Sequence, residues 1–156
     1  MFSFEFTVLN WIQDHLRSEF GDLVMPFFSA LGNGGLVWLV LAASLMILPK
    51  YRKTGYAVLI ALVLDALCCN VILKPLIARI RPCDVNTAMQ LLIACPSDFS
   101  FPSGHTAASF AAASALFFSR KKIWIPAMVL AASIAFSRLY LYVHYPTDVL
   151  AGVMLG

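Results

Sequence analysis

Residues 55–76 read GYAVLIALVLDALCCNVILKPL, and this apolar run decides the class of the fold. An α-helix needs about 20 apolar residues to cross the hydrocarbon core of a bilayer, and this run has that length. Asp65 is the one charged side chain in its interior, and Lys74 lies near its end. The run therefore predicts a transmembrane helix. Further apolar runs lie at residues 35–48, 103–119, 123–142 and 146–156.

Together these runs predict an all-α protein, a polytopic transmembrane helix bundle of about five spans that forms a single domain over residues 1–156. The composition agrees, because 61% of the residues are hydrophobic and 12% are charged, against about 25% charged residues in soluble domains. The mean hydropathy is +0.84. The net charge of +3 is small and the cations occur in short clusters, so we expect no nucleic-acid partner.

Two of the runs are short for a span. Residues 35–48 reach spanning length only if the helix begins near Ala30 and continues through the glycine-rich segment 32–35. The run from Pro146 to Gly156 cannot cross a bilayer, because each residue advances a helix by about 1.5 Å. We therefore expect the natural chain to continue beyond residue 156 and to complete the final span there.

Residues 1–22 have a different pattern, in which apolar residues are interleaved with charged ones such as Glu5, Asp14 and Arg17. This mixture predicts an amphipathic helix that lies in the membrane interface, because burying those charges in hydrocarbon would be costly. A first transmembrane helix with a polar end is the alternative. The segment does not resemble a signal peptide, since no basic stretch precedes its apolar residues.

Two short basic loops predict the orientation. Lys50, Arg52 and Lys53 join the runs at 35–48 and 55–76, and the Arg-Lys-Lys sequence at 120–122 joins the next pair of runs. Short basic loops favour the cytoplasmic side of a membrane. We therefore predict a multi-pass protein of the cell membrane, in which the other ends of these spans face the extracytoplasmic side.

Three polar clusters lie at those other ends. As patterns they read KxxxxxxRP from Lys74, PSGH from Pro102 and SRxxxxxHxxxD from Ser137. An isolated cation at membrane depth costs roughly 2.5–3.5 kcal/mol, so these clusters imply a compensating anion. Lys74 and Arg81 are spaced to share one helix face if the helix continues through Pro75. Alone, such a pair would more simply be interfacial cations.

The second and third clusters add groups that handle phosphate and protons. Ser103 and the backbone at Gly104 open an apolar run, where the free N–H groups of a helix N-terminus bind anions. His105 is then placed to donate a proton to a leaving group. Asp148 follows His144 by four residues, and a carboxylate bonded to one imidazole nitrogen leaves the other free to attack phosphorus.

In order and spacing, the three patterns resemble the motifs of the type 2 phosphatidic acid phosphatase family, and each named motif position is filled. The resemblance covers about half of the chain, from Lys74 to Asp148. It implies that His144 is the nucleophile, Asp148 its orienting partner and His105 the general acid and later base. It implies that the phosphoryl group is bound by Lys74, Arg81, Ser103, Gly104 and Arg138.

The resemblance implies an integral-membrane phosphatase that hydrolyses a lipid phosphate or lipid diphosphate through a phosphohistidine, with neither metal nor cofactor. Undecaprenyl diphosphate, phosphatidylglycerol phosphate and phosphatidic acid all remain open as substrates. A lipid-linked phosphotransferase is one alternative. A non-catalytic lipid-phosphate binder or transporter is another, although such a protein need not retain His105, His144 and Asp148. Related vanadium haloperoxidases bind vanadate in a similar cradle but are soluble.

Asp65 and the cysteines lie outside the motifs. Asp65 is an intramembrane carboxyl group, for which we favour a structural role over a functional one. Cys68 and Cys69 are predicted packing residues. Cys83 and Cys95 flank the loop that precedes the PSGH motif, and a disulfide between them is a hypothesis. Their spacing does not resemble a zinc site.

Overall fold

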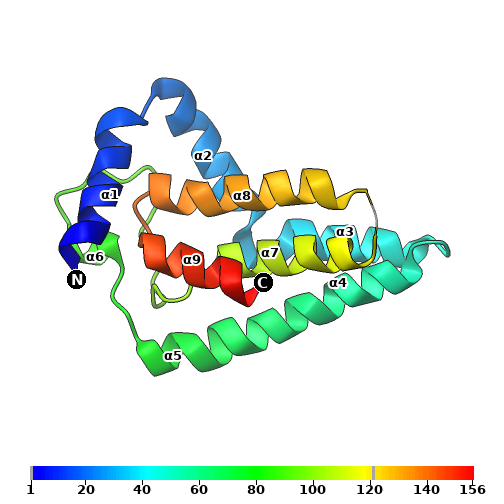
Figure 1. The fold of residues 1–156 in the computed structure, drawn as a ribbon. Helices are drawn as coiled ribbons and strands as arrows, with labels where there is room; N and C mark the ends of the chain where they lie inside the picture. The colour runs from blue at the N-terminus through cyan, green and yellow to red at the C-terminus, as the bar shows by residue number, and fades with distance from the viewer. Residues whose placement is uncertain (1, 121) are drawn as a thin grey trace.

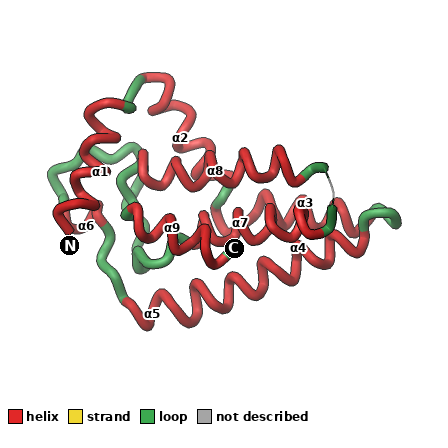
Figure 2. Tube along the Cα trace, viewed as in Figure 1, coloured by secondary structure: helices red, strands yellow, loops and turns green. Residues whose placement is uncertain are grey.

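A computed structural model describes residues 2–120 and 122–156 of the chain, so Met1 and Lys121 lie outside the described residues. The described residues form helices and loops without a strand, which confirms the all-α prediction (Figure 2). In chain order the elements are α1 (Phe2–His15), α2 (Glu19–Leu31), η1 (Asn33–Gly35), α3 (Leu36–Ile47), α4 (Arg52–Asp65), η2 (Ala66–Leu73), α5 (Lys74–Ile77), α6 (Pro82–Val85), α7 (Gly104–Phe118), α8 (Trp124–Tyr140) and α9 (Pro146–Leu155).

Helix α7 lies at the centre of the bundle and packs against α8, α4 and α9 (Figure 1). Its buried face is built largely from alanines, including Ala107, Ala111 and Ala112. Small side chains let neighbouring helices approach closely, which is how helices associate where lipid provides no hydrophobic driving force. The central helix therefore holds its first residues, which belong to the PSGH motif, in a fixed position.

Two glycines set the approach of α9 to α7. A Cβ atom on Gly152 would lie 2.9 Å from the Ser103 carbonyl oxygen, and one on Gly156 would lie 2.4 Å from the Ala111 nitrogen. The spacing of Gly152 and Gly156 is that of the GxxxG motif of closely packed membrane helices. This contact brings the start of α9, with Asp148, against the start of α7, where the Ser103 nitrogen donates to the Asp148 carbonyl oxygen at 3.1 Å.

The N-terminal segment predicted at 1–22 is divided. Helix α1 ends at His15, and α2 begins at Glu19 with Ser18 as its N-cap. Helix α2 continues into α3 across a 49° bend at η1, so the chain does break at the glycine-rich segment. The interfacial location of α1 stays a prediction.

Within residues 2–120 and 122–156, length and hydropathy identify one stretch that could cross a membrane, Arg52–Val85, and the bent pair of α2 with α3 would be a second. Helices α8 and α9 are also apolar but are shorter, at 10–17 residues. Large apolar side chains are exposed around the bundle, for example Leu23, Leu76, Phe118 and Met154. A surface of this kind suits a membrane protein, while the number of spans stays a prediction.

The connections sort to opposite ends of the bundle. Figure 1 shows the α3–α4 turn and the α7–α8 connection at one end, and the loops that follow α5 and α8 toward the other, near α1 and α6. The basic residues Lys50, Arg52, Lys53, Arg120 and Lys122 therefore share one end. The three motifs share the other.

Candidate active site

The three predicted clusters meet at one cavity of about 380 Å³. The apolar part of its wall is formed by residues of α3, α4 and α7, among them Leu39, Leu62 and Ala108. Ser103 and Asp148 are fully buried and lie outside its lining. The predicted site residues that line the cavity are Lys74, Arg81, Gly104, His105, Arg138 and His144.

Lys74 and Arg81 do not share a helix face, contrary to the expectation from their spacing. Helix α5 ends at Ile77, because Ala78 adopts a left-handed backbone conformation with φ of 47°. Arg81 instead directly precedes α6, within the segment that joins α5 to α7. The helix does continue past Pro75, but the left-handed residue Ala78 ends it before Arg81 is reached.

Asp98 joins the two cations instead. Arg81 donates from Nη2 to Asp98 Oδ1 at 2.6 Å, and Lys74 Nζ forms an ion pair with the other carboxylate oxygen. Burial alone would raise the pKa of Asp98, but the hydrogen bond from Lys74 and the charge of Arg81 lower it to about 2. The Asp98 side chain is nevertheless 51% exposed. An exposed carboxylate thus lies where two phosphate-binding cations were predicted.

His144 is held as a neutral imidazole with a defined tautomer. Its Nε2 lies 3.0 Å from Arg81 Nη1, which can only donate, so Nε2 carries the lone pair. Its Nδ1 lies 3.4 Å from Asp148 Oδ2 and carries the proton. Burial is the main cause that lowers the pKa of His144 to about 4, and the charge of Arg81 adds to it against the hydrogen bond to Asp148. A neutral imidazole with an unprotonated Nε2 is the form that attacks an electrophile once this nitrogen is released from its donor.

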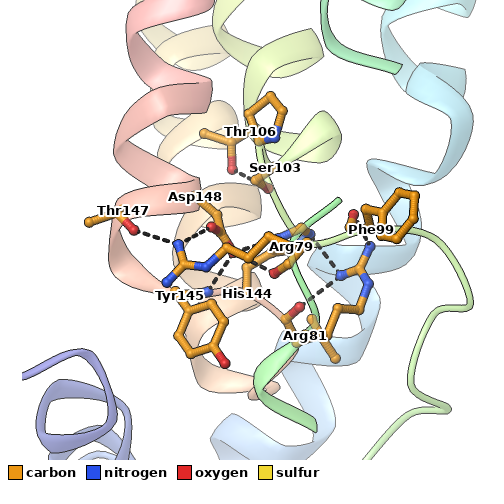
Figure 3. A network of polar contacts seen from close by, with 12 residues as sticks. Arg79, Arg81, Phe99, Ser103, Thr106, His144, Tyr145, Thr147 and Asp148 are labelled. Atoms are coloured by element: carbon orange, nitrogen blue, oxygen red, sulfur yellow. Dashed lines mark hydrogen bonds and ion pairs between the residues drawn. The ribbon is translucent and has the colours of Figure 1, made fainter. Parts of the chain in front are cut away.

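Asp148 is itself oriented by donors from three segments (Figure 3). Arg79 Nη1 donates to Oδ1 at 2.6 Å, while Oδ2 accepts from the Tyr145 nitrogen at 2.9 Å and from the Ser100 hydroxyl. The Arg79 guanidinium also stacks on the Tyr145 ring, 3.9 Å from its centroid. The predicted site did not include Arg79, because it is not one of the named positions of the KxxxxxxRP pattern.

The N-terminal helix completes this network. Glu5 of α1 is buried, forms an ion pair with Arg79 Nη2 and accepts from the Thr147 hydroxyl. Arg79 Nη1 also donates to Thr147 Oγ1 at 2.7 Å. Glu5 was expected on the polar face of an interfacial helix, and its sequence neighbours gave no sign that it reaches the site.

The PSGH motif opens α7 with backbone rather than hydroxyl groups facing the site. The Ser103 hydroxyl is buried and lies 2.9 Å from Thr106 Oγ1, so it turns away from the cavity. A Cβ on Gly104 would lie 3.1 Å from Asn70 Oδ1 and 3.7 Å from Lys74 Nζ. Glycine therefore leaves room beside the lysine at a helix N-terminus, where an anion is stabilised.

His105 receives an orienting partner from the bend between α2 and α3. Its Nε2 lies 2.8 Å from Asn33 Oδ1, an acceptor, so this nitrogen carries a proton. A Cβ on Gly32 would lie 2.8 Å from His105 Cδ2, so the ring packs directly against this glycine. Asn33 was considered only as part of a flexible segment, and its role depends on a contact across 72 residues.

Arg138 keeps part of its guanidinium free for a ligand. Its side chain is 2% exposed and donates from Nη1 to the Ser29 hydroxyl of α2. Within the described part of the chain, its buried Nε has no hydrogen-bond partner. A buried donor without an acceptor costs free energy, and an anion in the cavity would remove that cost.

The cysteines follow the sequence hypotheses in part. Cys83 and Cys95 form a disulfide within the segment that joins α5 to α7, as hypothesised. Cys69 is buried, as expected for a packing residue, whereas Cys68 is exposed on the bundle surface.

Comparison with known proteins adds to this geometry. A model of the PAP2 superfamily matches residues 52–156. An undecaprenyl-diphosphatase from Sulfolobus acidocaldarius is 36% identical over 134 residues, and the matched regions are 85% of this chain and 64% of that protein. The chain therefore spans less than two thirds of that relative's length.

Two crystal structures are similar over almost the whole chain. One is a transmembrane PAP2 type phosphatidylglycerolphosphate phosphatase from Bacillus subtilis, with 29% identity and a TM-score of 0.68 over 99% of this chain and 87% of that one. The other is LpxE from Aquifex aeolicus, with 28% identity and a TM-score of 0.81 over 98% and 90% of the two chains.

Proposed function

This chain belongs to the PAP2 superfamily, and from that premise we propose that it is an integral-membrane phosphatase of lipid phosphates or lipid diphosphates. The reaction would pass through a phosphohistidine on His144. One observation carries the proposal: the unprotonated His144 Nε2 lies beside Arg81 in the wall of a cavity that other cations also line. Its relatives by name act on different lipids, so the substrate is proposed only as a class.

Substrate binding would exchange one anion for another. The phosphoryl oxygens would replace the Asp98 carboxylate on Lys74 and Arg81, accept from the unpartnered Arg138 Nε, and approach the backbone at Gly104. Arg81 would then release the His144 Nε2 lone pair, because its donors turn to phosphate. Fixed cations stabilise the charge that spreads over the equatorial oxygens in the transition state.

The chemistry would proceed in two displacements. His144 Nε2 forms a bond to phosphorus as the bond from phosphorus to the lipid oxygen breaks. His105, as an imidazolium whose Nε2–H stays bonded to Asn33, donates its Nδ1 proton to that oxygen and becomes neutral. A water molecule then attacks the phosphohistidine, its proton passes to His105, and the bond between phosphorus and nitrogen breaks. Inorganic phosphate leaves, and both imidazoles return to their starting protonation states.

A bilayer lipid would enter from the side. The apolar part of the cavity is lined by Leu39 and Val63, which are both exposed on the bundle surface. Acyl or prenyl chains could stay among lipids while the phosphate reaches the cations. Because the basic connections lie at the opposite end of the bundle, we place the site on the extracytoplasmic side.

The test is phosphate release from phosphatidic acid, phosphatidylglycerol phosphate and undecaprenyl diphosphate by detergent-purified protein in EDTA. We expect release from at least one lipid, and none above background from His144→Ala. Acid-quenched wild-type protein should carry acid-labile phosphate on histidine, and the variant should carry none. Release that persists in His144→Ala would contradict the mechanism. Transfer of phosphate to a lipid or sugar, rather than to water, would identify a phosphotransferase.

A further inference from the structure

Asp65 lies in the wall of the same cavity but has no part in the chemistry described above. It is the last residue of α4, directly before the π-helical turn η2 that precedes Lys74. The residue is 8% exposed, and its Oδ1 has no hydrogen-bond partner among residues 2–120 and 122–156. π-helical turns inside longer helices occur frequently at functional sites.

A purely structural role would require a partner inside the bundle. Its sequence neighbours in the cavity wall, Leu62, Val63 and Ala66, cannot hydrogen bond through their side chains. A carboxyl oxygen buried in such surroundings costs free energy unless a donor reaches it. Since the described protein does not supply that donor to Oδ1, the cavity is the direction from which one can come.

The position of Asp65 along the helix indicates which part of a ligand it meets. Lys74 follows it by nine residues, eight of which form the π-helical turn η2, and both residues line the cavity. The cations bind the phosphoryl group at the outer end of the cavity. The group that carries the phosphate, on the lipid side of the scissile bond, then lies between the cations and Asp65.

The chemistry of the carboxyl group restricts what that group is. A second phosphate would be repelled by a carboxylate and offers no hydrogen-bond donor when ionised, and a plain diacylglycerol backbone offers no hydroxyl. A polyol such as glycerol or a sugar offers hydroxyl donors at the carbons adjacent to its phosphate ester. A site built to accept a hydroxyl discriminates strongly against the analogue that lacks it.

We propose that Asp65 is a specificity-determining residue that accepts a hydrogen bond from a hydroxyl of the polyol headgroup carrying the scissile phosphate. This inference rests on the proposed phosphatase function and narrows its substrate class. Monoesters of polyol headgroups rank above lipid diphosphates and above phosphatidic acid as substrates.

The experiment compares two lipids that differ by one hydroxyl. Phosphatidylglycerol phosphate is paired with an analogue whose terminal phosphate sits on propanediol, so that only the free hydroxyl of the headgroup is missing. The readout is the ratio of the two kcat/KM values within each protein. We expect wild type to favour the hydroxylated lipid by about 10- to 100-fold, below the largest discriminations known for buried hydroxyl sites.

Three variants separate hydrogen bonding from shape. Asp65→Leu removes the acceptor at similar volume and should bring the ratio close to one. Asp65→Asn keeps a carbonyl acceptor and should give an intermediate ratio. Val63→Leu alters the volume of the same cavity without a polar change and should keep the wild-type ratio, whereas a ratio near one in this variant would assign the preference to shape and overturn the proposal.

Binding measurements keep the test independent of turnover and of protein yield. Each lipid is titrated against His144→Ala protein with and without Asp65→Leu, and the hydroxyl preference should appear as a Kd ratio that the second substitution removes. Robust phosphate release with a wild-type ratio near one would overturn the Asp65 inference alone. Absence of release from every lipid, together with no histidine-bound phosphate, would overturn the proposed function instead.

Discussion

The two sides of His144 differ in how their polar groups are satisfied. Behind the ring, Asp148 is fully buried and accepts from Arg79, Ser100 and the Tyr145 backbone. In front of it, the Arg138 Nε has no partner within the described residues, and Lys74 and Arg81 are held by a half-exposed Asp98. We call the groups behind the ring the closed side, and they fix the orientation of the nucleophile before a ligand arrives. We call the groups in front of it the open side, and its positive charges can be paired by an anionic ligand.

The largest effect is expected when His144, which lies between the two sides, is removed. We expect His144→Ala to lower kcat/KM by at least about 10⁴-fold, as when other covalent nucleophiles are deleted. Phosphate release and histidine-bound phosphate should be lost together. His15→Ala changes a histidine that bonds only within α1 at Trp11 in the described structure, and serves as the control for handling and yield.

Loosening the closed side should have the next largest effect. We expect Arg79→Ala to lower kcat by about 10- to 100-fold with little change in KM, because partners that orient a catalytic group typically contribute that much. Arg79→Lys keeps the charge but not the planar fork, and should recover part of the loss. If KM rises while kcat is unchanged, Arg79 binds substrate and does not orient Asp148.

The same side can be tested from the N-terminal helix. Glu5→Gln keeps the size of a side chain that pairs with Arg79 and removes its charge. We expect kcat to fall by about 3- to 10-fold, less than for Arg79→Ala, because Arg79 still donates to Asp148. Asp14→Asn, on the same helix, is the matched control. An equal effect of both substitutions would point to a general property of α1.

On the open side, removing the internal anion should help the ligand. We expect Asp98→Asn to lower the KM for lipid and the inhibition constant of inorganic phosphate by about 2- to 10-fold, because Lys74 and Arg81 no longer exchange one carboxylate for another. Inhibition by phosphate in wild type and variant measures this directly. Weaker phosphate inhibition in the variant would instead make Asp98 a support for the two cations.

The smallest expected effect is on how activity and stability depend on pH in the acid range. Burial lowers the pKa of His144 to about 4, so the free enzyme keeps the neutral nucleophile as the pH falls from 7 to 5 and loses it near pH 4. The acid limb of kcat/KM should therefore lie well below the ordinary histidine pKa of about 6.5. An unfolded chain binds this proton first, so between pH 6.5 and 4 stability should decrease as the pH falls. An acid limb near 6.5 would mean that His144 is not desolvated in the free enzyme.

Sequence patterns were sufficient to predict the helical class and to bring the three clusters together as one candidate site. Helix class followed from apolar runs, and the clusters around Lys74, His105 and His144 contained the groups that line the cavity. The shared helix face of Lys74 and Arg81 was wrong, because a straight helix was assumed where Ala78 ends α5. Spacing arguments fail when the backbone changes direction between the residues.

Two of the residues that were missed contact the site across long sequence distances. Glu5 reaches Arg79 across 74 residues, and Asn33 reaches His105 across 72. Neither belongs to a pattern, and each has an ordinary local explanation as a surface charge or a turn residue. Only the packing of α1 and of the η1 bend against the site reveals them.

The residues that support the site therefore extend beyond its motifs. The superfamily match begins at residue 52, yet Glu5, Ser29 and Asn33 each hold a residue of the motif region or its immediate neighbour. Recombination that exchanged the first third of this chain for that of another lineage would have to inherit those three side chains as well. The helices before residue 52 are therefore part of the site's framework at the three positions that touch it.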